Sequence, residues 1–191
     1  VRQLHLRGII DMLAACLGEE SLCLGLFDQG EQLKQIAEKF AQLYIEVAKR
    51  GLAQRPRWQG GYVSTWGLYA PGTLLDYQVD ASNMIGADLY EGLFLEYDSA
   101  IISNFDYSIV HVHNCGTHII DSLVKIEKLG AIEISLDRES DVLEPDKIVE
   151  CCNKIQTANK SVMVYGQLSQ GELEVLTSAL DSVGLAILYW E

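Results

Sequence analysis

The feature that most constrains the fold is the repeated alternation of short apolar segments with longer helical patterns in the second half of the chain. Three apolar segments rich in β-branched residues recur there: Ala131-Ile132-Glu133-Ile134-Ser135, Ser161-Val162-Met163-Val164-Tyr165 and Leu185-Ala186-Ile187-Leu188-Tyr189. The segments between them have helical patterns. Strands that are joined through helices run parallel, so the sequence predicts an α/β fold with a parallel sheet.

Local signals place the connecting helices. We expect a strand over 107–115 followed by a helix over 117–127, and a strand over 130–136 followed by a helix over 145–158. Pro145 suits the first turn of that helix. A strand over 161–166 precedes a helix over 170–182, where Ser169 and Glu172 have the spacing of a capping box. A strand over 184–190 completes the pattern.

The first third of the chain has a different pattern. Apolar residues recur at helical spacing over 2–17 and 32–53, and 58–72 is rich in glycine and aromatic residues, which is typical of a strand with an irregular loop. Another helix is expected over 87–104. A chain of 191 residues can bury one sizeable core. We therefore expect a single domain over 1–191, with a helical N-terminal segment, 1–57, and βα units over 58–191.

A strictly alternating segment, 74–80, places Asp76, Gln78 and Asp80 on one face of a strand and apolar residues on the other. On a sheet with one wet side, this polar face would meet solvent. In a barrel it would point into the lumen. The pattern alone leaves both readings open.

Two histidines and a cysteine mark the expected functional site. His111, His113 and Cys115 are spaced by two residues, with valines between them, so on a strand they share one face. Imidazole and thiolate are preferred zinc ligands, and the carboxyl end of a strand is where α/β proteins place their chemistry. A single histidine or cysteine is usually structural, but three on one face are less easily explained that way. A tetrahedral site needs at least one more ligand from elsewhere in the chain.

Charge and cysteine content exclude several classes of protein. The chain has 27 acidic and 14 basic residues, a net charge of -13, which disfavours nucleic acid and anionic membranes as partners. Five cysteines do not suggest a disulfide scaffold, and neither a signal peptide nor an apolar run long enough to span a membrane is visible. We expect a soluble cytoplasmic protein. Because residue 1 is valine, we also expect the sequence to be part of a longer chain.

Several short motifs, in order, resemble the uroporphyrinogen decarboxylase superfamily, which includes the zinc-dependent coenzyme M methyltransferases of corrinoid systems. The motifs are Arg7-Gly8-Ile9-Ile10-Asp11, Leu17-Gly18-Glu19-Glu20, Tyr69-Ala70-Pro71-Gly72, Val79-Asp80-Ala81-Ser82, His113-Asn114-Cys115-Gly116 and Leu129-Gly130-Ala131-Ile132-Glu133-Ile134-Ser135-Leu136-Asp137. Each is weak alone, but their order is fairly specific and covers nearly the whole chain. The resemblance implies a TIM barrel of which this chain is the C-terminal part, a partial barrel of later βα units whose N-terminal strands are missing.

The methyltransferase branch carries a His-x-Cys pair on the fifth strand and a distant second cysteine. The resemblance therefore implies His113 and Cys115 as zinc ligands, His111 as a ligand or pocket residue, and Asp80 as a residue that orients substrate. The distant cysteine would lie near the end of the last strand, whereas Cys151 and Cys152 fall earlier, in an expected helix. The decarboxylase branch fits less well, because its arginine-rich substrate motif belongs to the missing part and this chain has only six arginines.

Three functions follow as hypotheses. The first is a zinc-dependent methyltransferase in which zinc lowers the pKa of a thiol substrate, which then takes a methyl group from a corrinoid protein. The second is a lyase of porphyrin metabolism, a decarboxylase-like enzyme that holds a tetrapyrrole without a metal. The third is a catalytically incomplete accessory domain, and the fragment alone is expected to be inactive. Open sheet edges favour a homodimer, and the alternative is a monomer in which the helices 2–17 and 32–53 cover the exposed surface.

Overall fold

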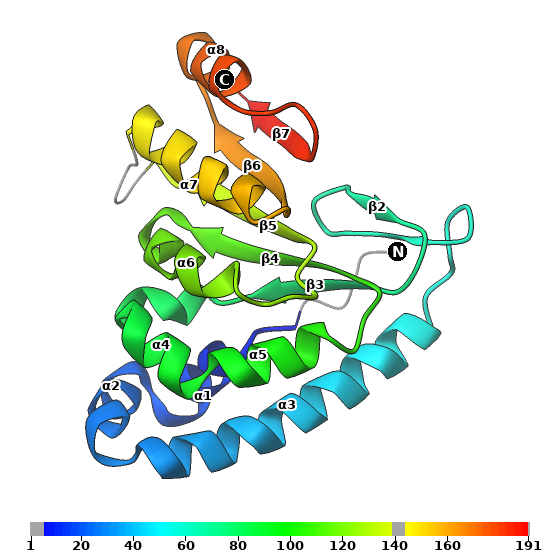
Figure 1. Cartoon of the computed structure of the whole chain (residues 1–191). Coiled ribbons are helices and arrows are strands. Elements are labelled where there is room, and N and C mark those ends of the chain that lie inside the picture. The colour runs from blue at the N-terminus through cyan, green and yellow to red at the C-terminus, as the bar shows by residue number, and fades with distance from the viewer. Residues whose placement is uncertain (1–5, 139–143, 191) are drawn as a thin grey trace.

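The computed structural model describes residues 6–138 and 144–190 and shows an α/β fold built on one parallel sheet (Figure 1). The sheet contains five strands in the order β3-β4-β5-β6-β7, so strands that follow one another in the sequence lie side by side. Their bounds are Leu74–Gln78 (β3), Tyr107–His113 (β4), Ala131–Leu136 (β5), Ser161–Gln167 (β6) and Leu185–Trp190 (β7). The expected parallel α/β sheet is confirmed. It is compatible with part of an α/β barrel.

Helices connect the strands. They are α4 (Ala87–Leu93) and α5 (Leu95–Ile102) before β4, α6 (Ile120–Leu123) before β5, α7 (Pro145–Thr157) before β6 and α8 (Gln170–Ala179) before β7. Short 3-10 helices, η1 (Asp80–Met84) and η2 (Asn114–Ile119), follow β3 and β4 directly. Pro145 begins α7, and the capping box between Ser169 and Glu172 begins α8, as the sequence predicted.

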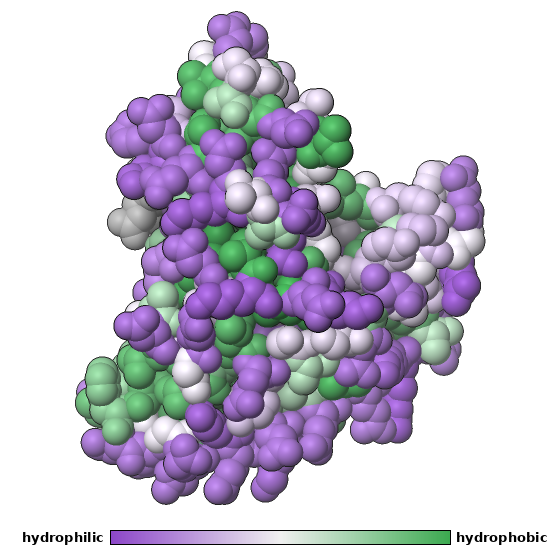
Figure 2. All heavy atoms as spheres, viewed as in Figure 1, coloured by the Kyte–Doolittle hydropathy of each residue, from purple (hydrophilic) through white to green (hydrophobic). Residues whose placement is uncertain are grey.

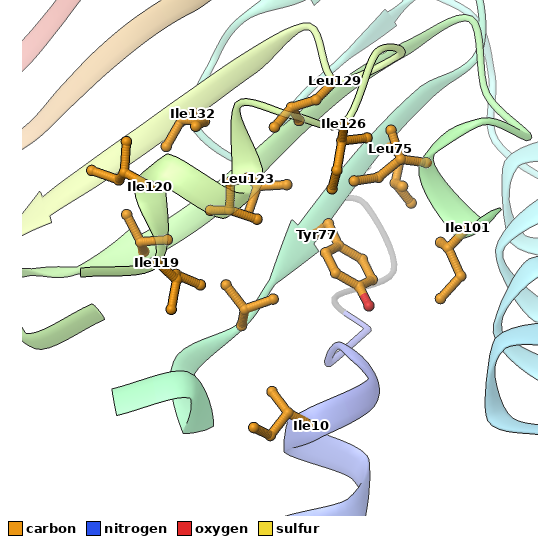
Figure 3. Packing of buried hydrophobic residues seen from close by; sticks show 14 of the residues in the cluster. Ile10, Leu75, Tyr77, Ile101, Ile119, Ile120, Leu123, Ile126, Leu129 and Ile132 are labelled. Carbon is orange, nitrogen blue, oxygen red and sulfur yellow. The ribbon is translucent and has the colours of Figure 1, made fainter. Parts of the chain in front are cut away.

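The core lies between the sheet and these helices. Alternate strand residues such as Val110, Val112, Ile132 and Ile134 are fully buried in one apolar cluster with residues of α5, α6 and α7. Figure 3 shows part of this layer, where Ile119, Ile120 and Leu123 approach the sheet beside Ile132. Burying one such side chain contributes roughly 1.5–3 kcal/mol, so this layer fixes which face of each strand is left for polar residues.

The N-terminal segment forms three helices, α1 (Ile9–Leu17), α2 (Glu19–Asp28) and α3 (Gly30–Ala53). Helix α3 packs against α5 and α1, and α1 packs against η1. The Gly8 N–H, just before α1, donates to the carbonyl of Gln78 at 2.9 Å, so the edge of β3 is partly covered. The helix expected over 2–17 is helical from Ile9 to Leu17, with residues 2–5 outside the described part of the chain, and the helix expected over 32–53 is present as α3. Helix α2, which the sequence did not predict, lies between them and is separated from α1 by Gly18, whose φ is 83°.

Other boundaries differ slightly from expectation. The helix expected over 87–104 breaks at Phe94 into α4 and α5. The strand expected over 107–115 ends at His113, because the chain turns into η2 at Asn114. The expected strand is therefore wrong for its last two residues, and Cys115 lies in η2 rather than on β4. The segment 58–72 forms a small antiparallel hairpin, β1 (Tyr62–Val63) with β2 (Tyr69–Ala70).

The surface is mostly polar, with a few apolar exceptions. Figure 2 shows hydrophilic residues over most of the face in view, and apolar residues over α2, where Leu24 and Phe27 are 63% and 77% exposed. At the far edge β7 pairs only with β6 within the described residues, and Leu188, Tyr189 and Trp190 are each at least 40% exposed. No helix in the described ranges is both long and apolar enough to cross a membrane. The expected homodimer stays a prediction.

Candidate metal centre

Polar side chains from three neighbouring strands meet where the strands end. His111 and His113 lie on β4, Glu133 lies on β5, and Asp80 and Asp137 follow β3 and β5 directly. The Nε2 atoms of the two histidines are 3.1 Å apart, while Val110 and Val112 are buried on the opposite face. The predicted facing of His111 and His113 is therefore confirmed.

The centre of the cluster is a triangle of ligand atoms. Oδ1 of Asp80 lies 3.7 Å from Nε2 of His111 and 3.7 Å from Nε2 of His113. In the described part of the chain, these three residues form a group whose ligand atoms all lie within 4.8 Å of one another, which could hold a metal ion. The side chain of Asp80 is about a quarter exposed and that of His113 about a third, so the triangle is open on one side.

Each histidine is held from behind by a carboxylate. Nδ1 of His111 is hydrogen-bonded to Oε2 of Glu133, and Nδ1 of His113 is 2.6 Å from Oδ2 of Asp137. With its Nδ1–H donated to a carboxylate, a neutral imidazole presents the lone pair of Nε2 to the opposite side. This is the tautomer that a metal-ligating histidine needs, and carboxylates commonly fix it in that role.

The carboxylates around His111 and His113 favour a positive charge at the two imidazoles. Burial works against protonation of His111, but the hydrogen bond with Glu133 and the negative charges around the ring outweigh it, so the pKa of His111 is raised. Glu133 is fully buried, and its Oε1 atom has no hydrogen-bond partner in the part of the chain that the structure describes. A group of anionic side chains that raises the proton affinity of an imidazole also attracts a cation to the same place.

The loop after β3 is held so that Asp80 faces the histidines. Asp11 on α1 accepts hydrogen bonds from the backbone N–H groups of Asp80 and Ala81, at 3.3 and 2.6 Å. Burial raises the pKa of Asp11 to about 6, although the Ala81 hydrogen bond opposes this shift. Arg7 lies 3.4 Å from Oδ2 of Asp80, which leaves Oδ1 directed at the two Nε2 atoms. The first turn of α1 therefore positions a ligand about 70 residues away in the sequence.

The residues fit a divalent metal ion. Within the described residues, Oδ1 of Asp80 is buried and has no hydrogen-bond partner, which is unfavourable unless a cation or water meets it. Two nitrogen ligands of a tetrahedral zinc lie about 3.4 Å apart, close to the 3.1 Å between the two Nε2 atoms. Two imidazoles and one carboxylate leave at least one coordination position free, as in catalytic rather than structural zinc sites.

Cys115 lies outside this group. It is half-buried in η2, next to the strand end, and all five cysteines of the chain are free thiols. Of the two ligands implied by the family resemblance, the structure brings His113 to the triangle, with Asp80 and His111 beside it instead of Cys115. The ring of His118 lies between the carbonyl oxygens of Cys115 and Ile85, at 3.0 and 2.8 Å, and serves the loop rather than the cluster.

Sequence reasoning did not assign the two carboxylates behind the histidines. Glu133 is a charged residue in an otherwise apolar strand, which is a signal for a buried partner. The register of β4 with β5 pairs Glu133 with His111, and Asp137 lies beyond Ser135, the partner of His113. Neither pairing can be read from one strand alone, because both depend on the register between strands.

Comparisons with models of protein families, with curated proteins and with solved structures found no match to this chain.

Proposed function

We propose that this chain belongs to a zinc-dependent enzyme that activates a thiol for methyl transfer, with Asp80, His111 and His113 as the metal ligands. The observation that supports the metal is that the Nε2 atoms of two histidines, each held by a carboxylate, converge on Oδ1 of Asp80, which has no hydrogen-bond partner among the described residues. The thiol and the methyl transfer rest on the resemblance to the methyltransferase branch of the uroporphyrinogen decarboxylase superfamily. In that branch the chain would supply the later strands of a TIM barrel.

Each residue of the site would have a separate role in holding the metal. His111 and His113 supply two nitrogen ligands, and Glu133 and Asp137 keep the rings in the tautomer that exposes Nε2. Asp80 supplies the third ligand. A zinc ion held by these three residues would lower the pKa of a coordinated thiol, and would so supply a thiolate at neutral pH for a methyl group carried by a corrinoid.

The proposed ligand set differs from the one that the resemblance implies. Cys115 is replaced by an oxygen ligand and a second nitrogen ligand, so the site lacks a thiolate of its own. A zinc ion without a protein thiolate keeps more positive charge, which strengthens its effect on the pKa of a bound thiol. This difference makes the ligand set a separate, testable part of the proposal.

The first experiment measures metal binding. Protein purified without chelator is analysed for metal content, and zinc affinity is measured by competition with a chromogenic chelator. Wild type should hold about one zinc per chain, and His113→Ala and Asp80→Asn should lose it. His118→Ala is the matched control, because it removes a neighbouring imidazole whose hydrogen bonds go to the backbone carbonyls of Cys115 and Ile85. It should bind zinc like wild type.

The second experiment tests the thiol. Cobalt(II) replaces zinc, and thiols are added while the absorption spectrum is recorded; a sulfur-to-cobalt charge-transfer band in the near ultraviolet is expected. Metal binding without that band would refute thiol activation and keep the metal site.

Absence of metal binding in wild type would refute the proposal as a whole. The direct contact between the two Nε2 atoms, at 3.1 Å, would then be a hydrogen bond that the pair makes without an ion, with one of the two imidazoles protonated on both nitrogens. That outcome would leave the decarboxylase-like enzyme acting on a tetrapyrrole and the incomplete accessory domain, and the negative charge around the histidines favours the accessory domain.

A further inference from the structure

We infer that Trp66 is a positioning residue for the metal centre. It lies on the loop of the β1–β2 hairpin and covers one face of the His111 ring. Its effect on metal affinity rests on the proposed function, but the stacking itself does not.

The indole and imidazole rings are nearly parallel. The ring centroids of Trp66 and His111 are 5.4 Å apart and the planes differ by 10°. This is an offset stack of the kind that aromatic pairs favour. His113 meets the same imidazole nearly at right angles, with centroids 4.5 Å apart, and Glu133 holds its Nδ1 atom. His111 is thus restrained on three sides and is only 6% exposed.

The loop that carries Trp66 is fastened to the sheet. The N–H and the hydroxyl of Thr65 donate to Oδ2 of Asp76, at 2.6 and 2.8 Å. Asp76 is buried on β3, the strand that leads to Asp80. Within the loop, the N–H of Leu68 donates to the hydroxyl of Ser64, and Gly67 adopts φ of 86°, which suits glycine. Trp66 is therefore placed by hydrogen bonds to the same strand that places a proposed ligand.

Trp66 is not placed there by the hydrophobic core. It is half-buried and belongs to neither the core cluster nor the partly buried residues packed on it. Trp58, on the same hairpin, packs edge-on against Tyr69 instead, with centroids 5.7 Å apart. The indole stacks on the imidazole of His111, so the site contributes to the position of Trp66.

The stack should favour the metal-loaded state. An imidazole bound to a dication is electron-poor, and the face of tryptophan attracts positive charge within about 6 Å of its centroid. The interaction is therefore stronger with the metal than without it, and its loss weakens metal binding rather than only loosening the loop.

The test compares Trp66→Ala and Trp66→Phe with wild type in zinc affinity, again by chelator competition. We expect Trp66→Ala to bind zinc about three- to tenfold more weakly, since aromatic pairs contribute on that scale. Trp66→Phe keeps a ring and should recover at least half of the loss on a logarithmic scale. Trp58→Ala, which removes the other indole of the hairpin, is the control and should match wild type.

A second readout needs no metal. The imidazole of His111 stacks on the indole, so nuclear magnetic resonance of metal-free protein with labelled histidine should show its carbon-bound protons shifted by the indole ring current. That shift should disappear in Trp66→Ala and persist in Trp58→Ala. The same spectra show whether the variant keeps the fold, because the resonances of His118, which contacts the carbonyls of Cys115 and Ile85, should not move.

The outcomes separate this inference from the proposed function. A ring-current shift without zinc binding in wild type would support the stacking and refute the metal site. Zinc binding that is equally tight in wild type and Trp66→Ala would overturn the positioning role of Trp66 and leave the metal site intact. Loss of affinity in Trp66→Ala that Trp66→Phe does not recover would also contradict the stacking argument.

Discussion

A buried carboxylate in the core allows a quantitative prediction about stability and pH. Asp98 on α5 is completely buried and accepts hydrogen bonds from the hydroxyls of Tyr77 and Tyr90, the latter at 2.6 Å. The Tyr77 hydroxyl in turn accepts the N–H of Ile9 at 3.1 Å. One side chain therefore joins β3, α4, α5 and the start of α1. Burial raises the pKa of Asp98 to about 7, although both hydroxyls act to lower it.

The size of the effect follows from that shift. A rise from 3.8 to about 7 corresponds to about 4 kcal/mol at 1.36 kcal/mol per unit. Because the folded pKa is the higher one, the folded protein binds more protons between these two values. The contribution is therefore fully present below about pH 4 and is lost as the pH rises through about 7. Between about pH 5 and pH 7, roughly 2–3 kcal/mol of the free energy of unfolding should be lost.

Substitution Asp98→Asn removes the titration and keeps the shape of the side chain. Urea unfolding of wild type and Asp98→Asn is measured from pH 5 to pH 8. The difference in free energy of unfolding between the two proteins should change by the 2–3 kcal/mol derived above and then level off. Asp88→Asn, an exposed carboxylate on α4, is the control and should run parallel to wild type. Parallel curves for wild type and Asp98→Asn would refute the reasoning.

Three other substitutions test the metal centre and the packing of α1. Glu133→Gln should weaken zinc binding about 10- to 100-fold, because it disturbs the tautomer of His111, and an unchanged affinity would show that the contact is incidental. Cys115→Ala should leave zinc affinity unchanged, and loss of zinc would restore the cysteine to the ligand set. In Gly8→Ala the added Cβ would lie 2.2 Å from the Gln78 carbonyl oxygen, whereas at Gly86 nothing lies within 4 Å. Thermal unfolding should show about 1–3 kcal/mol lost in Gly8→Ala and little change in Gly86→Ala.

Much of the fold could be predicted because its signals are local. The strands over 130–136, 161–166 and 184–190 and the helices after Pro145 and Ser169 agree with the structure within a few residues. Helix α2, over Glu19–Asp28, was not predicted. Its apolar residues do not mark one buried face, because Leu24 and Phe27 are exposed.

Only part of the site could be predicted from the sequence, for a different reason. His111 and His113 share a face by the period of a strand, which one sequence shows directly. Cys115 has the same spacing of two residues, but the strand ends at His113, so Cys115 does not share the face of the two histidines. The approach of Asp80 depends on α1 and η1, and that of Glu133 on the register between strands. These contacts depend on tertiary structure, and the spacing of residues along one segment does not predict them.

Charge around the histidines bears on the order of events in the proposed reaction. Asp80, Glu133 and Asp137 all lie in contact with the imidazole pair, and Arg7 contributes one opposing charge. Without a metal, this end of the sheet would repel an anionic substrate, and a tetrapyrrole that carries several carboxylates would be repelled most. A divalent cation offsets that charge and leaves an open coordination position. In the proposed function the metal therefore binds first, and it is what makes an anionic or thiolate ligand acceptable at this site.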